Sequence, residues 1–182
     1  VFSIIFLNSC TKYKLNRSTT SSGDNSISET AFDDVYKVVN ETAVDESSNK
    51  DMNSYSFGNC ATVTVDPAWP DSTFPKTVTV DFGSSNCVGT DGRSRRGKIV
   101  YTMSDRYRNI GSVISVTPQD YYVNDYKVEG SKSITNNGRN SNDNLSYTIE
   151  VTNAKVTTPQ GDEITWESTR IREWIEGEST TF

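Results

Sequence analysis

The chain alternates apolar and polar residues over most of its length after Cys60, and this two-residue period dominates what it can fold into. Such alternation is typical of β-strands with one buried and one exposed face. Turn sequences such as Asn137-Gly138 separate the runs, so successive strands are expected to pair antiparallel. The strands are predicted at residues 62–65, 76–82, 97–104, 111–117, 126–136, 145–157 and 163–175. We therefore predict a mainly β domain over residues 54–182, an antiparallel meander that is sandwich-like or curled.

The last two predicted strands span about 13 residues each, which favours a strongly twisted or curled sheet. The chain ends soon after the second of them. That strand is therefore either an edge of the sheet or the end of a fragment. We favour a C-terminal truncation, because a long open edge invites pairing with another chain.

One helix is predicted before the strands. Ser26 and Glu29 have the spacing of a capping box, in which two side chains satisfy backbone donors of the first turn. Apolar residues then recur at helical spacing over residues 29–45, namely Phe32, Val35, Tyr36, Val39 and Ala43. This stripe is expected to pack on the sheet, with docking to a partner as the alternative. Residues 26–53 are thus assigned to a helix and a polar linker.

The N-terminal residues point to export. The apolar run from Val1 to Leu7 is typical of the end of a secretory signal and is too short to span a bilayer. Leu7-Asn8-Ser9-Cys10 resembles the lipobox of bacterial lipoproteins, which implies that residues 1–9 are a signal-peptide remnant and that Cys10 carries the lipid. The alternative is an ordinary thiol at Cys10. Several acyl chains would hold the protein at a membrane. Residues 10–25, poor in apolar side chains, are predicted to form a flexible tether, and an N-terminal truncation is expected.

Charge and composition narrow the function. The chain has 18 Lys and Arg against 24 Asp and Glu, a net charge of -6, and no histidine. The acidic balance argues against a nucleic-acid-binding protein, because phosphate neutralisation needs a basic face. The lack of histidine removes the commonest general base and the commonest zinc ligand. We expect neither a cofactor nor a metal site.

Two cysteines remain once Cys10 is assigned to the lipid. In an oxidising compartment, Cys60 and Cys87 are expected to form a disulfide. The alternatives are two unrelated buried thiols, or a metal site completed by carboxylates.

Aromatic residues are the most attractive candidates for a ligand site, because flat rings on a sheet can stack against sugars. They are Tyr101, Tyr107, Tyr121, Tyr122, Tyr126, Tyr147, Trp166 and Trp174. Most are expected to form cross-strand pairs or to fill the core. The candidate ligand-binding residues are Trp69, Tyr121, Tyr122 and Trp174, which the pattern places in loops or near strand ends.

Charged residues offer two further candidates. The basic cluster at residues 93–98 could hold phosphate or carboxylate groups, but a solvated hairpin that deters edge pairing is favoured. Carboxylates that could supply an acid and a base for sugar hydrolysis are Glu163, Glu167, Glu173, Asp81 and Asp125. Their spacing is not diagnostic, and the three glutamates share one strand parity, as on a solvated face opposite Arg170 and Arg172. No catalytic residue is assigned, since no serine-nucleophile or phosphate-loop motif occurs.

Several short motifs resemble a family of uncharacterised bacterial lipoproteins. They are Phe57-Gly58-Asn59-Cys60, Asp81-Phe82-Gly83, Asn86-Cys87, Arg96-Gly97-Lys98-Ile99, Tyr121-Tyr122-Val123-Asn124 and Glu173-Trp174. The resemblance implies a secreted, β-rich lipoprotein of the gram-negative cell envelope, usually longer than this chain, with no known activity. In such lipoproteins acidic residues after the cysteine direct export to the outer face. Here Thr11-Lys12-Tyr13-Lys14 follow, which implies the periplasmic face of the outer membrane. Asp71-Ser72-Thr73 resembles an acceptor for bacterial O-glycosylation.

These observations predict a lipid-anchored, non-catalytic binding or structural module of the cell envelope. Its expected partners are the membrane, through the anchor, and a glycan or an envelope protein. The alternative is a carbohydrate-active enzyme that uses a carboxylate pair.

Overall fold

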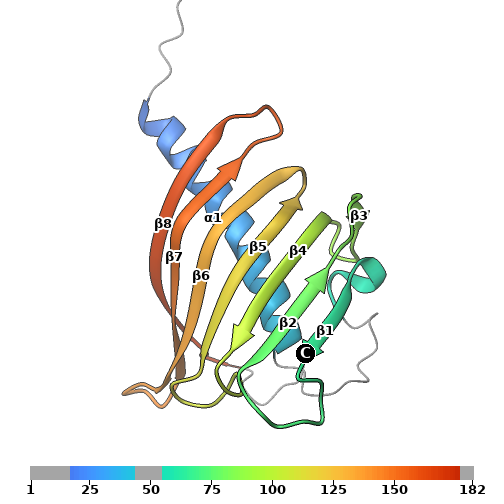
Figure 1. The fold of residues 1–182 in the computed structure, drawn as a ribbon. Coiled ribbons are helices and arrows are strands. Elements are labelled where there is room, and N and C mark those ends of the chain that lie inside the picture. Colours follow the sequence, from blue (N-terminus) through green and yellow to red (C-terminus); the bar gives the residue numbers. More distant parts are fainter. Residues whose placement is uncertain (1–16, 44–54, 177–182) are drawn as a thin grey trace, which may run out of the picture.

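The alternating segments form one antiparallel sheet, and a single long helix runs diagonally across one of its faces (Figure 1). A computed structural model describes residues 17–43 and 55–176. The elements are α1 (Arg17–Ala43), the 3-10 helix η2 (Gly58–Cys60), β1 (Thr62–Asp66), β2 (Lys76–Asp81), β3 (Cys87–Val88), β4 (Ser94–Met103), β5 (Val113–Val123), β6 (Tyr126–Arg139), β7 (Leu145–Thr157) and β8 (Glu163–Glu173). Their order in the sheet is β1-β2-β4-β5-β6-β7-β8, with β3 paired to β4. The predicted meander is confirmed as one open sheet, not a sandwich.

Most strand boundaries follow the two-residue period. The predicted strand at residues 145–157 coincides with β7, and β8 starts at the predicted Glu163. Three segments differ from the prediction: β4 already begins at Ser94, β5 continues to Val123, and β3 (Cys87–Val88) was not predicted. These segments lack a regular apolar alternation, so their strand conformation depends on pairing with neighbours.

The apolar stripe of α1 packs on the sheet, as predicted. Phe32, Val35 and Val39 are buried, and Val38 joins them. Their neighbours in the core come from the inward faces of β2 and of β4 to β7. This burial of one helix face is what holds α1 on the sheet.

The helix begins at Arg17, well before the predicted capping box at Ser26. Residues 17–25, predicted to be part of a flexible tether, are therefore helical. Ser26 is an interior residue whose carbonyl accepts a hydrogen bond from the Thr30 hydroxyl at 2.8 Å. A tertiary contact supports the additional turns, since Trp166 Nε1 on β8 donates to Asn25 Oδ1 at 2.9 Å. Helices gain most of their stability from such packing, so local capping signals are easily overridden.

Two glycines allow the strands to bulge. At Gly97 (φ 86°) the register between β4 and β5 shifts, and a Cβ there would lie 2.0 Å from the carbonyl oxygen of Asp120. At Gly130 (φ 122°) a Cβ would lie 2.7 Å from Ala154 Cα, where β6 and β7 change register. Bulges increase the local twist of a sheet, which helps this one to curl along α1.

The predicted disulfide between Cys60 and Cys87 is confirmed, with a Cα–Cα distance of 5.6 Å. It joins η2 to β3, outside the path of the main sheet. In the chain-entropy model a loop of this size contributes roughly 3 to 4 kcal/mol to stability.

The sheet has two edges, β1 and β8, among the described residues. On β8, the outward residues Glu163, Glu167 and Glu173 are exposed, while Arg170 and Arg172 lie on the side of α1. The predicted solvated face of this strand is confirmed. The predicted signal remnant, Cys10 and the predicted linker at residues 46–53 lie outside the described residues.

Candidate functional site

Trp69 belongs to the Pro-rich loop between β1 and β2, and it packs on a buried lysine. Lys76 Nζ lies 4.2 Å from the centroid of the Trp69 ring. The same ammonium donates to the carbonyl oxygens of Pro67 at 2.8 Å and Asp71 at 2.6 Å. Phe74 meets the Trp69 ring edge-on, with centroids 6.1 Å apart. A half-buried indole engaged in this way organises its own loop.

Tyr121 and Tyr122 point to opposite faces of β5. Tyr121 is fully buried, and its hydroxyl donates to Asp34 Oδ2 on α1 at 2.5 Å. Burial raises the pKa of Tyr121, and the neighbouring Asp34 raises it further. The ring is enclosed by the core, so the hypothesis that Tyr121 presents a face to a ligand is corrected. Tyr122 is half-buried, with the guanidinium carbon of Arg96 3.7 Å from its ring centroid.

Trp174 lies at the end of β8, beside an open cleft that we call the α1–β8 cleft. The cleft has a volume of about 410 Å³. Its lining residues are Tyr36, Asn40, Tyr147, Arg172, Glu173, Trp174, Ile175 and Glu176. The backbone N–H of Trp174 donates to the Leu145 carbonyl at 2.8 Å, which extends the β7–β8 pairing beyond Glu173.

The aromatic walls of the α1–β8 cleft are held by other rings. Tyr147 stacks on Tyr107 with ring centroids 5.0 Å apart, and the hydroxyl oxygens of Tyr107 and Tyr36 are 3.3 Å apart. Arg172 covers the ring of Tyr36 at 4.5 Å and donates to Asp33 at 2.6 Å. The cleft thus combines preformed aromatic surfaces with an amide, a guanidinium and carboxylates.

The four aromatic candidates do not form one platform. Trp69 and Trp174 belong to opposite edges of the sheet, yet the β4–β5 loop contacts both: Arg106 lies 5.9 Å from the Trp69 ring and Arg108 lies 5.3 Å from the Trp174 ring. Tyr122 lies at the other end of the strands, near the β5–β6 turn. Of the four candidates, Trp174 lines a cleft in the part of the chain that the structure describes.

The basic segment at residues 93–98 contributes to a partly buried charge cluster, defined by Asp34, Lys37, Asp91, Arg93 and Arg95. Arg95 is fully buried, and its Nη2 lies 2.6 Å from Asp34 and 2.7 Å from Asp91. Arg93 reaches Asp34 at 2.7 Å, and Lys37 reaches Asp91 at 3.0 Å. The expectation of a fully solvated basic hairpin is therefore wrong for Arg95, because α1 supplies a carboxylate directly above it.

Hydrogen bonding keeps two members of the charge cluster, Asp91 and Arg95, ionised. Burial acts to raise the pKa of Asp91, but hydrogen bonds from Arg95 and Lys37 outweigh it and hold the pKa well below its usual range. Burial acts to lower the pKa of Arg95, but hydrogen bonds with Asp91 and Asp34 raise it above its ordinary value. A buried charge that is paired at both ends tolerates desolvation. The cluster therefore fixes the register of α1 on β4.

Sequence reasoning missed Asp34 and Lys132, although both stand at informative positions. Asp34 interrupts the apolar stripe of α1, and Lys132 has the inward parity of Ile134 on β6. A charged residue on an otherwise apolar face is a signal of buried pairing. Lys132 Nζ donates to the Phe32 carbonyl at 2.7 Å, and burial lowers its pKa to about 7.

No family model, curated protein or solved structure matches this chain.

The described residues hold no group of three or more Cys, Asp or Glu side chains placed to bind a metal ion. Within the same part of the chain, α1 lacks the apolar length that a membrane-crossing helix needs.

The carboxylates considered for catalysis are paired or exposed. Asp81 lies 2.7 Å from Lys98, and Asp125 lies 2.5 Å from Arg96. A hydrogen bond from Lys98 lowers the pKa of Asp81, and hydrogen bonds from Asn86 and Arg96 lower that of Asp125. A general acid in glycoside hydrolysis needs a raised pKa, so neither carboxylate is tuned for that role.

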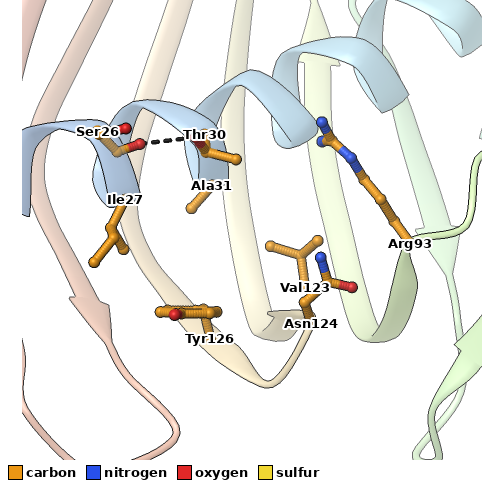
Figure 2. A pocket seen from close by; sticks show the side chains of 8 residues that line it. All are labelled: Ser26, Ile27, Thr30, Ala31, Arg93, Val123, Asn124 and Tyr126. Carbon is orange, nitrogen blue, oxygen red and sulfur yellow. Dashed lines mark hydrogen bonds between the residues drawn. The ribbon is translucent and has the colours of Figure 1, made fainter. Parts of the chain in front are cut away.

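A second pocket lies between α1 and the β5–β6 turn (Figure 2), and we call it the Arg93 pocket. Its volume is about 180 Å³. The lining residues are Ser26, Ile27, Thr30, Ala31, Arg93, Val123, Asn124 and Tyr126. It borders the charge cluster through Arg93, a residue of both.

Proposed function

We propose that this protein is a non-catalytic binding module of the bacterial cell envelope that recognises a saccharide in the α1–β8 cleft. The observation that carries the proposal is the cleft itself. Binding sites for small molecules are concave, mostly apolar or aromatic, and hold a few fixed polar groups. Trp174 supplies an aromatic surface, and Asn40 and Arg172 supply donors beside it. Its volume of about 410 Å³ lies in the usual range of roughly 300–1,000 Å³ for ligand sites.

A binding role is favoured over hydrolysis by the charges near the candidate carboxylates. Asp81 and Asp125 are each held ionised by a cation, as described above. The exposed Glu163 lies 3.1 Å from Lys155 on the outward face of the sheet. These three carboxylates are paired and lie outside the α1–β8 cleft, whose own carboxylates are Glu173 and Glu176, so none of the three supplies an acid–base pair there.

The test is a glycan-array screen of the full chain, followed by titration of each hit. Trp174→Ala should abolish binding, because the aromatic surface of the cleft is lost. Trp174→Phe should retain part of it, since an aromatic face remains. Tyr122→Ala is the matched control, an aromatic residue outside the cleft, and should bind as the wild type does. Binding that survives in Trp174→Ala, or a folded wild-type protein that binds no glycan, would refute the saccharide site.

Two further measurements test the rest of the proposal. Mass analysis of the bound glycan after incubation should show no cleavage, whereas hydrolysis products would favour the carbohydrate-active enzyme. Lipid anchoring at Cys10, on the periplasmic face of the outer membrane, rests on the resemblance to a lipobox. It is tested by labelling cells with an alkyne-bearing fatty acid: the natural protein should incorporate the label, and Cys10→Ala should not.

A further inference from the structure

The charge cluster leaves positive charge at the wall of the Arg93 pocket. Three cations, Lys37, Arg93 and Arg95, face two carboxylates, Asp34 and Asp91. Arg95 contacts both carboxylates and is fully enclosed. The Arg93 side chain, in contrast, is 32% exposed, and Asp34 is the one side chain with which it pairs among the described residues. Since a guanidinium carries five N–H donors, Arg93 retains donors for a ligand.

Asn124 provides a second, rigidly held donor in the same wall. Its Oδ1 accepts a hydrogen bond from the backbone N–H of Ser94 at 2.9 Å, and the backbone N–H of Asn124 donates to the Ser94 carbonyl at 2.8 Å. These contacts fix the orientation of the amide, so that Nδ2 is left as a donor. Figure 2 shows this nitrogen turned toward α1. A donor fixed in this way binds without further loss of side-chain entropy.

The other wall of the Arg93 pocket is apolar. Ala31 and Val123 are buried, and Ile27 and Tyr126 are half-buried. Figure 2 shows Ile27 pointing from α1 toward the ring of Tyr126, with Arg93 and Asn124 on the other side. The pocket therefore has one apolar wall and one cationic, hydrogen-bonding wall.

We propose that the Arg93 pocket binds a small organic carboxylate. Its carboxylate group accepts hydrogen bonds from the Arg93 guanidinium and the Asn124 amide, and its apolar body packs between Ile27 and Tyr126. Guanidinium and carboxylate groups match in geometry and in charge. The volume of about 180 Å³ is below that of sites for drug-sized molecules, so the ligand is a short acid with a single ring or a short branched chain.

Sodium phenylacetate is a suitable probe, with phenylacetamide as its neutral analogue. The full chain is titrated with each compound and followed by ¹⁵N–¹H NMR. Phenylacetate should shift the backbone signals of Ala31, Val123 and Tyr126, and phenylacetamide should bind at least about tenfold more weakly, as expected for loss of a charge-assisted hydrogen bond. Arg93→Gln should lower the affinity for phenylacetate by a similar factor.

Two control variants and one variant that blocks the pocket test whether the binding is specific. Arg96→Gln removes a neighbouring arginine that pairs with Asp125 outside the pocket, and it should leave phenylacetate binding unchanged. Trp174→Ala should also leave it unchanged, so this test is independent of the saccharide site. Ala31→Leu, which places a larger side chain in the pocket, should abolish binding while the thermal unfolding temperature shows that the chain is folded.

Three results would overturn the proposal. One is the absence of shifts at phenylacetate concentrations up to about 10 mM. A titration to this concentration would detect binding even with a millimolar Kd. Another is equal affinity for phenylacetamide, because the carboxylate would then play no role. The third is unchanged binding in both Arg93→Gln and Ala31→Leu, which would place the ligand elsewhere.

Discussion

Lys132 offers a quantitative test of how α1 packs on the sheet. Its side chain is 3% exposed, and its ammonium donates to the Phe32 carbonyl on α1. That carbonyl lies within the helix and keeps its backbone partner if the lysine is removed. Replacing the lysine by methionine, Lys132→Met, keeps a similar length and volume and removes the buried charge.

The magnitude follows from the pKa of Lys132. Burial lowers this pKa from 10.5 to about 7; the charge of Asp33 acts in the opposite direction, and Arg172 and Arg170 lower it further. From about pH 7 to 10.5 the unfolded chain therefore binds a proton that the folded chain does not, so the free energy of unfolding rises with pH. At about 1.36 kcal/mol per pH unit, the difference between 10.5 and 7 amounts to roughly 5 kcal/mol.

Lys132→Met should thus be more stable than the wild type at pH 7, by about 3 to 5 kcal/mol. The advantage should shrink by about 1.4 kcal/mol per pH unit as the pH rises toward 9.5. Urea unfolding followed by tryptophan fluorescence, at several values from about pH 6 to 9.5, measures both quantities. Tyr107 and Tyr121, whose pKa values burial raises, are present in both proteins, so their effect cancels in the difference.

Lys127→Met is the matched control, because Lys127 is on the same strand but lies 3.1 Å from Glu129 near the surface. Its effect should stay within about 1 kcal/mol. Parallel pH profiles for the wild type and Lys132→Met, or a lower stability of the variant at every pH, would refute the reasoning about the buried charge.

Two further substitutions test the charge cluster and the bulge. Arg95→Met should lower the free energy of unfolding by about 3–5 kcal/mol, because it leaves the buried Asp34 and the half-buried Asp91 without their common partner; Arg96→Gln, at an exposed pair, should change it by less than about 1 kcal/mol in the same urea experiment. Equal effects of the two would contradict the assigned burial. Gly97→Ala should destabilise the protein far more than Gly161→Ala, since both glycines have positive φ but only at Gly97 does a Cβ meet backbone atoms. Similar melting temperatures for these two variants would contradict this reasoning, because β4 and β5 would then accommodate a Cβ at Gly97 without loss of stability.

Much of the sheet was predictable because strand conformation leaves a local pattern. The alternation over residues 145–157 predicts β7 without reference to any other strand. The disulfide was also predictable from the sequence, since Cys60 and Cys87 are the two cysteines that remain once Cys10 is assigned to the lipid. The start of α1 was not, because its first turns are Ser- and Thr-rich and depend on contacts such as that between Asn25 and Trp166.

The candidate site was predictable in its residue types but only partly in their placement. Trp174 was selected as an aromatic residue at a strand end, and the structure places it beside a cleft. Tyr121 was selected on the same ground, yet it is buried against Asp34. Sequence pattern assigns alternate residues to two faces of a strand, but it does not say which face a helix will cover.

The sequence by itself determined the class of fold, the antiparallel order of the strands and the one disulfide, because alternation, turn residues and cysteine count are local or countable properties. The tertiary structure decided which charges are buried. Asp34 and Arg95 are 61 residues apart and meet only when α1 docks on β4. It also decided where ligands can enter, since both the α1–β8 cleft and the Arg93 pocket lie between the helix and the sheet. Sites of this kind depend on long-range packing, for which a local pattern carries no information.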